Sequence, residues 1–87
     1  EKMGMLYKVF PDEIFTDESK KIATTLAAMP TKGLAYTKQV LNHSFINHWE
    51  DQLQDEDIFQ QRAAQTADYK EGVQSFLEKR QPDFKGE

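Results

Sequence analysis

Residues 68–84 read DYKEGVQSFLEKRQPDF, and this stretch carries the clearest structural pattern of the 87-residue chain. One side of it is apolar at helical spacing and comprises Tyr69, Val73, Phe76, Leu77 and the aliphatic stem of Arg80. Asp68 and Glu71 stand where a capping box would place them, and Pro82 cannot continue a helix. The stretch therefore predicts an amphipathic helix over about residues 67–80, capped by Thr66 or Asp68.

Two details of this end of the chain carry further expectations. Gly72 lies inside the predicted helix, where glycine costs about 1 kcal/mol relative to alanine. We take this cost as a sign that another backbone approaches the helix closely at Gly72. Residues 85–87 contain no apolar side chain, and we expect them to be frayed.

Composition limits the class of protein. The chain is 38% hydrophobic and 30% charged, which is typical of one small folded domain and predicts a packed helical core. Its net charge of −4 is spread without a long run of one sign, which argues against a nucleic-acid partner. There is no cysteine, no apolar run long enough to span a membrane and no signal peptide, so the sequence predicts a cytoplasmic protein.

The remaining pattern is mainly α-helical. Residues 3–10 are apolar and β-prone, and we expect them to form a short strand or an extended arm. No other segment alternates with a period of two, so such a strand has no partner within the chain, which suggests that the chain is part of something larger. Three further helices are predicted, over residues 16–29 with Thr16 as cap, from Thr31 to about Asn42–Ser44, and over residues 47–65 with Asn47 as cap.

The sequence contains no convincing catalytic or metal site. His43 and His48 are five residues apart across a predicted helix break, which does not put both on one helical face, and we expect them to be exposed or capping. The carboxylates of residues 55–57 point in different directions around a helix. This acidic turn either is solvated or meets a polar partner. We assign no catalytic residue and no metal ligand.

Several motifs resemble those of one enzyme family. The closing stretch has the form Asp-Tyr-x-Glu-Gly-Val-x-x-Phe-Leu-x-Lys-Arg-x-Pro-x-Phe, residues 4–12 read GMLYKVFPD, and residues 26–38 read LAAMPTKGLAYTK. All three, in this order, resemble the carboxy-terminal part of the crotonase superfamily, the enoyl-CoA hydratases and isomerases. Within it, the stretches PTKGL and ADYKEGV are most similar to the phenylacetate-pathway branch, the epoxyphenylacetyl-CoA isomerases.

The resemblance implies a division of the chain and a function. Residues 1–15 would end the family's α/β core, and residues 16–87 would form a four-helix subdomain that serves oligomerisation and covers the coenzyme A site. The parent enzyme would act on acyl-CoA thioesters through an enolate held by two backbone amides, and it would form a homotrimer or a dimer of trimers. Coenzyme A would enter as part of the substrate, with no other cofactor. Because the family's catalytic groups precede this part, residues 1–87 alone should be inactive and should self-associate.

The resemblance also implies one ligand contact. In relatives, the lysine of the Phe-x-x-Lys-Arg motif, here Lys79, lies near the adenine and phosphate end of coenzyme A. The alternative is that Lys79 and Arg80 only complement the carboxy-terminal end of their helix. Relatives place an aromatic residue near the adenine from the preceding helix, whereas the matching position here is Gln60, with Phe59 beside it. We expect Phe76, like the rest of its apolar face, to pack against protein rather than ligand.

A second hypothesis for the function of the chain does not involve an enzyme. The absence of a site, together with amphipathic helices, also fits a free-standing helical protein-interaction module without catalytic activity.

Overall fold

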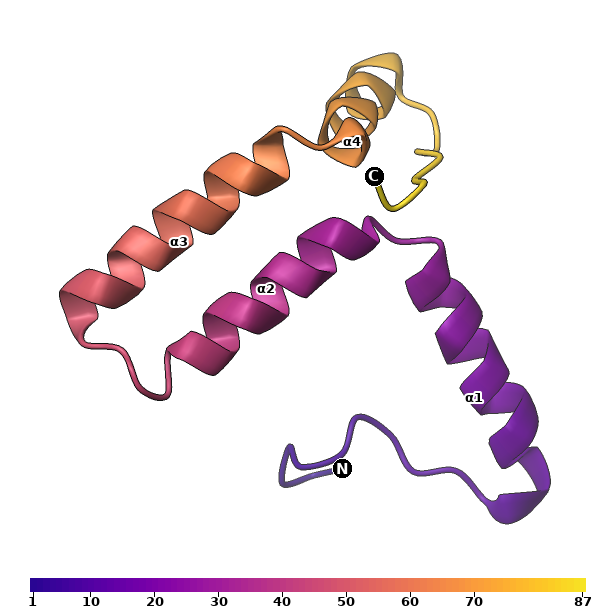
Figure 1. Ribbon diagram of the computed structural model, residues 1–87. Coiled ribbons are helices and arrows are strands. Elements are labelled where there is room, and N and C mark those ends of the chain that lie inside the picture. The colour runs from indigo at the N-terminus through magenta and orange to yellow at the C-terminus, as the bar shows by residue number, and fades with distance from the viewer.

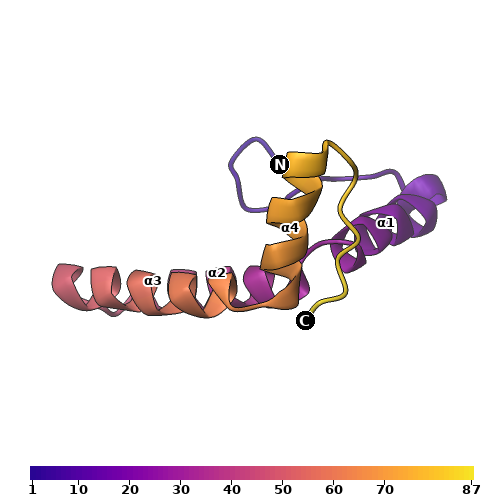
Figure 2. The same cartoon turned by 90° about the horizontal axis from the view of Figure 1, so that it is seen from above.

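The structure, a computed structural model, describes residues 1–87 and contains four α-helices and no strand. The helices are α1 (Asp12–Ala27), α2 (Thr31–His43), α3 (Trp49–Ala64) and α4 (Ala67–Glu78). Helices α2 and α3 lie side by side and antiparallel, α4 stands across the end of this pair, and α1 runs away from it (Figures 1 and 2). The prediction of a mainly α chain with four helices is confirmed.

The amino-terminal segment is an arm. The alternative of a short strand over residues 3–10 is wrong, because residues 3–7 form turns and bends and residues 8–10 have no regular secondary structure. The backbone N–H of Gly4 donates to the carbonyl of Glu1 at 2.9 Å, and Gly4 has a φ of +77°. A strand requires a neighbour to take its backbone hydrogen bonds, and this chain supplies none.

Helix α1 begins at Asp12, four residues earlier than predicted, and ends at Ala27 rather than at residue 29. The expected cap Thr16 lies inside the helix, and Pro11 with an extended ψ of 147° precedes it instead. Asp12 and Glu13 occupy the first turn, where their carboxylates complement the positive end of the helix dipole. The sequence Pro-Asp-Glu was thus a helix start, although it has the composition of a turn.

The other helix boundaries lie close to their predicted positions. Helix α2 begins at Thr31, directly after Pro30. Helix α3 begins at Trp49 after His48, and no side chain caps it, so Asn47 is not the cap. The hydroxyl of Thr66 accepts a hydrogen bond from the backbone N–H of Tyr69 at 3.1 Å and caps α4.

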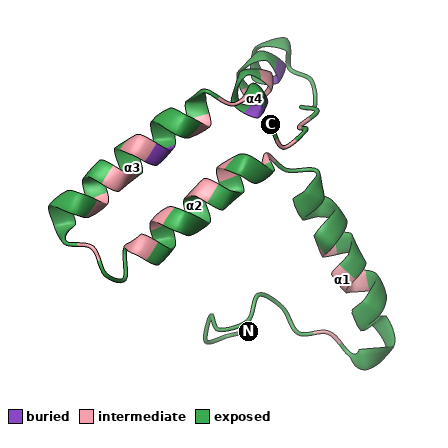
Figure 3. Cartoon of the chain, viewed as in Figure 1, coloured by how far each residue is buried: buried purple, intermediate pink, exposed green.

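The α2–α3 hairpin (residues 31–64) holds the only buried apolar side chain, Phe59, which is 8% exposed. Its ring lies 5.7 Å from that of Tyr36 and 6.0 Å from that of His43, measured between centroids. The guanidinium of Arg62 lies 5.2 Å from the same ring. Of the three buried residues, Phe59 lies on α3, and Asp68 and Ser75 lie on α4, whereas α1 has none (Figure 3).

The chain exposes far more surface than a compact protein of its mass. Its accessible surface is 7535 Å², whereas a compact monomer of 10.1 kDa exposes about 5300 Å². Its radius of gyration is 16.4 Å, against about 12 Å for a compact domain of this length. The prediction of a packed core within the chain is therefore wrong, because most apolar side chains have no partner in residues 1–87. No helix combines the length and the hydrophobicity needed to cross a lipid bilayer.

Candidate functional site

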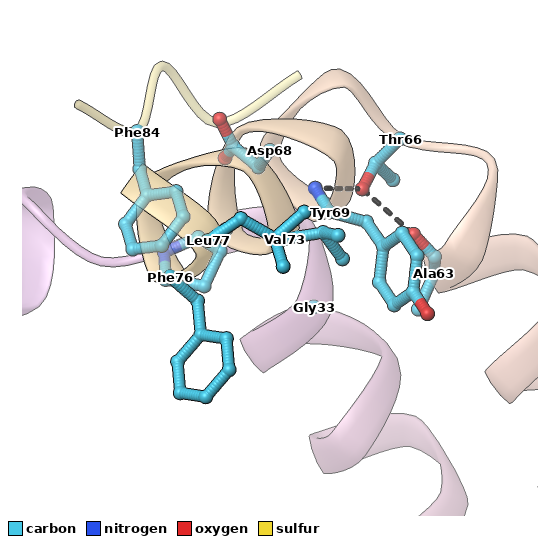
Figure 4. A pocket seen from close by; sticks show the side chains of 11 residues that line it. Gly33, Ala63, Thr66, Asp68, Tyr69, Val73, Phe76, Leu77 and Phe84 are labelled. Atoms are coloured by element: carbon cyan, nitrogen blue, oxygen red, sulfur yellow. Dashed lines mark hydrogen bonds between the residues drawn. The ribbon is translucent and has the colours of Figure 1, made fainter. Parts of the chain in front are cut away.

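An apolar groove of about 520 Å³ lies beside α4, between the end of α3, the start of α2 and the carboxy-terminal tail. Its apolar wall on α4 is formed by Tyr69, Val73, Phe76 and Leu77 (Figure 4), and Asp68 and Gly72 of the same helix also line it. Phe76 is 81% exposed and Leu77 is 68% exposed. The apolar face predicted for this helix is therefore present, but nothing within the chain packs on most of it.

The end of α4 presents Lys79 from a strained turn. Lys79 is the only residue other than glycine with a positive φ, at 54°, with a ψ of 39°. The backbone N–H of Arg80 donates to the carbonyl of Ser75 at 3.0 Å, and that of Lys79 to Phe76 at 3.2 Å, which closes the helix in a Schellman-type turn. The position favours glycine, and the Lys79 ammonium takes part in none of the ion pairs of the chain.

Arg80, next in the chain, forms ion pairs with two carboxylates. Its guanidinium donates to both carboxylate oxygens of Glu71, at 2.5 and 2.8 Å, and to Glu78 at 2.6 Å. The same Glu71 carboxylate accepts the backbone N–H of Asp83 at 2.9 Å. The hydrogen bonds from Arg80, followed by that from Asp83, lower the pKa of Glu71 to about 2, and the two carboxylates raise the pKa of Arg80.

A buried aspartate holds the tail (residues 81–87). Asp68 is 3% exposed, and its two oxygens accept the backbone N–H groups of Lys85 at 2.7 Å and Gly86 at 2.8 Å. Its own backbone N–H donates to the carbonyl of Glu87 at 2.9 Å. Two expectations are corrected here: Asp68 and Glu71 are not a capping box, because both carboxylates bind the tail, and the tail is not frayed.

The tail also explains Gly72. A methyl group at Gly72 would lie 3.6 Å from Cε1 of Phe84, so the close neighbour is an aromatic ring of the tail and not a second backbone. Gly86, at a φ of +78°, passes so close to Thr31 that a methyl group there would lie 2.5 Å from its hydroxyl oxygen. The tail therefore runs from the end of α4 back to the start of α2.

The acidic turn of α3 meets a polar partner, as one of the two predicted alternatives stated. His43 Nδ1 lies 2.7 Å from Asp55 Oδ2, and the amide of Asn47 donates to the same oxygen at 3.0 Å. The hydrogen bond with His43, then that from Asn47, lowers the pKa of Asp55. This cluster fastens the two helices beside the loop of residues 44–48 that connects them. It brings together two potential metal ligands, and no group of three or more occurs in the chain.

The other residues singled out from the sequence lie apart from Lys79. Phe59 is in the interior of the hairpin, and Gln60 lines a smaller hollow of about 290 Å³ between α2 and α3. Sequence reasoning missed the Glu71–Arg80 pair, because a spacing of nine residues brings two side chains together only when the chain reverses. Pro82, four residues after the end of α4 at Glu78, was the available signal of that reversal.

Comparison with known proteins decides the family. The family model described as enoyl-CoA hydratase/isomerase matches residues 1–87. The chain belongs to the enoyl-CoA hydratase/isomerase family. It is 42% identical over 83 residues to the 1,2-epoxyphenylacetyl-CoA isomerase of Escherichia coli K12, covering 95% of this chain and 32% of that protein. It is 36% identical over 85 residues to a probable enoyl-CoA hydratase of Rhodobacter capsulatus, covering 98% and 33%.

A solved structure agrees with this family assignment. The enoyl-CoA hydratase from Geobacillus kaustophilus HTA426 matches 99% of this chain and 33% of its own, with a TM-score of 0.88 and 28% identity. The chain thus spans about a third of the length of the relatives it matches, and it corresponds to their carboxy-terminal third. The resemblance read from the sequence, including its likeness to the epoxyphenylacetyl-CoA isomerases, is confirmed.

Proposed function

We propose that residues 1–87 are the helical carboxy-terminal third of an enzyme that acts on acyl-CoA thioesters as a hydratase or isomerase. The observation that carries this proposal is a family match over the whole chain that spans only 32–33% of the relatives' length. The enolate of the reaction would be held by backbone amides in the part of the enzyme that precedes this segment. The name of the Escherichia coli relative makes 1,2-epoxyphenylacetyl-CoA the first substrate to test.

In this proposal, residues 1–15 end the α/β core and residues 16–87 dock on it and on neighbouring subunits of a trimer or a dimer of trimers. The exposed surface supports the idea. The 7535 Å² of the chain exceeds that of a compact monomer by about 2200 Å². Obligate interfaces bury about 2000 Å² or more and are apolar. The groove on α4, whose wall carries Phe76 and Leu77, has that character.

We also propose that Lys79 contacts a phosphate of coenzyme A. An ammonium is a good point-charge partner for phosphate, and Lys79 is exposed and has no carboxylate partner. Arg80 is the poorer candidate because Glu71 and Glu78 occupy its guanidinium. Lys79 also keeps a left-handed backbone where glycine would cost less, and residues held in such conformations cluster at functional sites.

The test is a Lys79→Ala variant of the full-length enzyme, titrated calorimetrically with coenzyme A. We expect the affinity to fall about tenfold, the size of one charge-assisted hydrogen bond, with kcat unchanged. Lys70→Ala is the matched control, since Lys70 is an exposed lysine of α4 that forms no ion pair. Equal affinities for Lys79→Ala and the parent enzyme would refute the contact.

A further inference from the structure

The turn that carries Lys79 is bound from the side by one carboxylate. Glu71 lies two turns earlier in α4, and it accepts two hydrogen bonds from the Arg80 guanidinium and one from the backbone N–H of Asp83. These contacts hold the chain on the carboxy-terminal side of Lys79, while the helix itself holds the amino-terminal side. Nothing in the catalytic proposal uses Glu71.

We propose that Glu71 is a positioning residue for Lys79: together with Arg80 it fixes the left-handed turn from which the Lys79 ammonium reaches a phosphate group of coenzyme A. This inference rests on the proposed contact between Lys79 and coenzyme A. It assigns Glu71 and Arg80 no contact with the ligand.

The backbone of Lys79 needs such support. A left-handed conformation costs a residue with a β-carbon about 1 kcal/mol or more. Besides the Glu71 contacts, two backbone hydrogen bonds and the local hydrogen bonds of Arg80 to Glu78 and to the carbonyl of Gln81 hold the turn. The bidentate geometry of a guanidinium on a carboxylate fixes orientation as well as distance. The same hydrogen bonds, first those from Arg80 and then that from Asp83, lower the pKa of Glu71 to about 2 and so favour the charged carboxylate that binds Arg80.

The arrangement also decides which cation is free. Arg80 is neutralised by Glu71 and Glu78, and Lys85 pairs with Asp83 at 2.8 Å. Lys79 alone among the cations of this turn and tail has no carboxylate partner. By occupying Arg80, Glu71 leaves one ammonium to meet an anionic ligand, at a position that the turn fixes.

A double-mutant cycle on the full-length enzyme tests the inference, with coenzyme A as the probe and Glu71→Gln, Lys79→Ala and the double variant as the proteins. We expect Glu71→Gln to weaken coenzyme A binding about threefold in the parent background and to have no further effect in the Lys79→Ala background. With acyl-CoA substrate, KM should rise while kcat stays constant. Asp83→Asn is the control, because it removes one negative charge from the tail and leaves the Glu71 contacts in place.

The outcomes separate the inference from the proposed function. Equal losses from Glu71→Gln in both backgrounds, or no loss in either, would overturn the positioning role while Lys79 still contacts the ligand. No loss from Lys79→Ala would instead overturn the contact, and the inference with it. Should Glu71→Gln prevent folding, Arg80→Lys replaces it, since it keeps the charge and loses the two-pronged bond to Glu71. The same absence of coupling would then overturn the inference.

Discussion

The α2–α3 hairpin and the combination of α4 with its tail are fastened in the same way and packed differently. Each has a carboxylate clamp: Asp55 binds His43 in the hairpin, and Asp68 binds two backbone N–H groups of the tail. Their apolar sides contrast, because Phe59 in the hairpin is 8% exposed and Phe76 on α4 is 81% exposed. The hairpin buries one aromatic ring between its own two helices, whereas α4 and its tail bury only polar side chains.

This difference shows how a segment can be locally ordered without being a self-sufficient domain. Hydrogen bonds and caps set the conformation of α4 and its tail, but burial of apolar surface supplies most of the free energy of folding. In the proposed enzyme, that burial takes place against protein that precedes residue 1 or belongs to another subunit.

The largest expected effect on stability comes from truncating Phe59, compared with truncating Phe76, in residues 1–87 alone. Phe59→Ala should lower the free energy of unfolding by about 3 kcal/mol, because it empties the only buried apolar position. Phe76→Ala should change it by less than about 0.5 kcal/mol, because the ring is exposed. Urea unfolding followed by circular dichroism measures both. Equal losses would mean that α4 is packed within the chain and that the contrast is false.

Breaking the clamp on the tail should have a smaller effect. Asp68→Asn leaves one carbonyl oxygen for two backbone N–H groups in a buried position, and we expect a loss of about 2 kcal/mol in the full-length enzyme. Hydrogen exchange at the amides of Lys85 and Gly86 reports the release of the tail directly. Asp83→Asn, which breaks only an exposed ion pair, should leave this exchange unchanged. Unaltered protection in Asp68→Asn would contradict the clamp.

The smallest expected effect on stability comes from replacing one glycine in each region, Gly72 in α4 and Gly33 in α2. Gly72→Ala should raise the free energy of unfolding by up to about 1 kcal/mol, since the added methyl group makes an ordinary contact with Phe84 and alanine favours the helix. Gly33→Ala in α2 is the matched variant, because nothing lies within 4 Å of its methyl group. A loss of stability in Gly72→Ala alone would show that the Phe84 ring packs more tightly than described.

The sequence predicted the helices better than the contacts that the segments make with one another. Helical spacing and the prolines at positions 30 and 82 predicted four helices, because these signals are local. The start of α1 was misplaced, since Pro-Asp-Glu suits both a turn and a first helical turn. Of the two alternatives for residues 3–10, the strand was wrong and the arm was right, because a strand depends on a neighbour that this chain does not supply.

The site was only partly predictable for a similar reason. Lys79 was identified from its motif, whereas its left-handed turn was not, because a lysine gives no sign of a positive φ. The roles of Glu71 and Asp68 depend on the tail folding back across α4. A capping box explains both carboxylates equally well from sequence spacing, and only three-dimensional contact distinguishes the two.

The central claim is that the apolar face of α4 is covered only in the longer enzyme. Hydroxyl-radical footprinting with mass spectrometry measures the side-chain exposure of Phe59, Tyr69 and Phe76 in dilute residues 1–87 and in the full-length enzyme. We predict that Phe59 is protected in both proteins, whereas Tyr69 and Phe76 are oxidised in the segment and protected in the enzyme. Equal oxidation of Phe76 in the two proteins would contradict the account and would favour a free interaction surface.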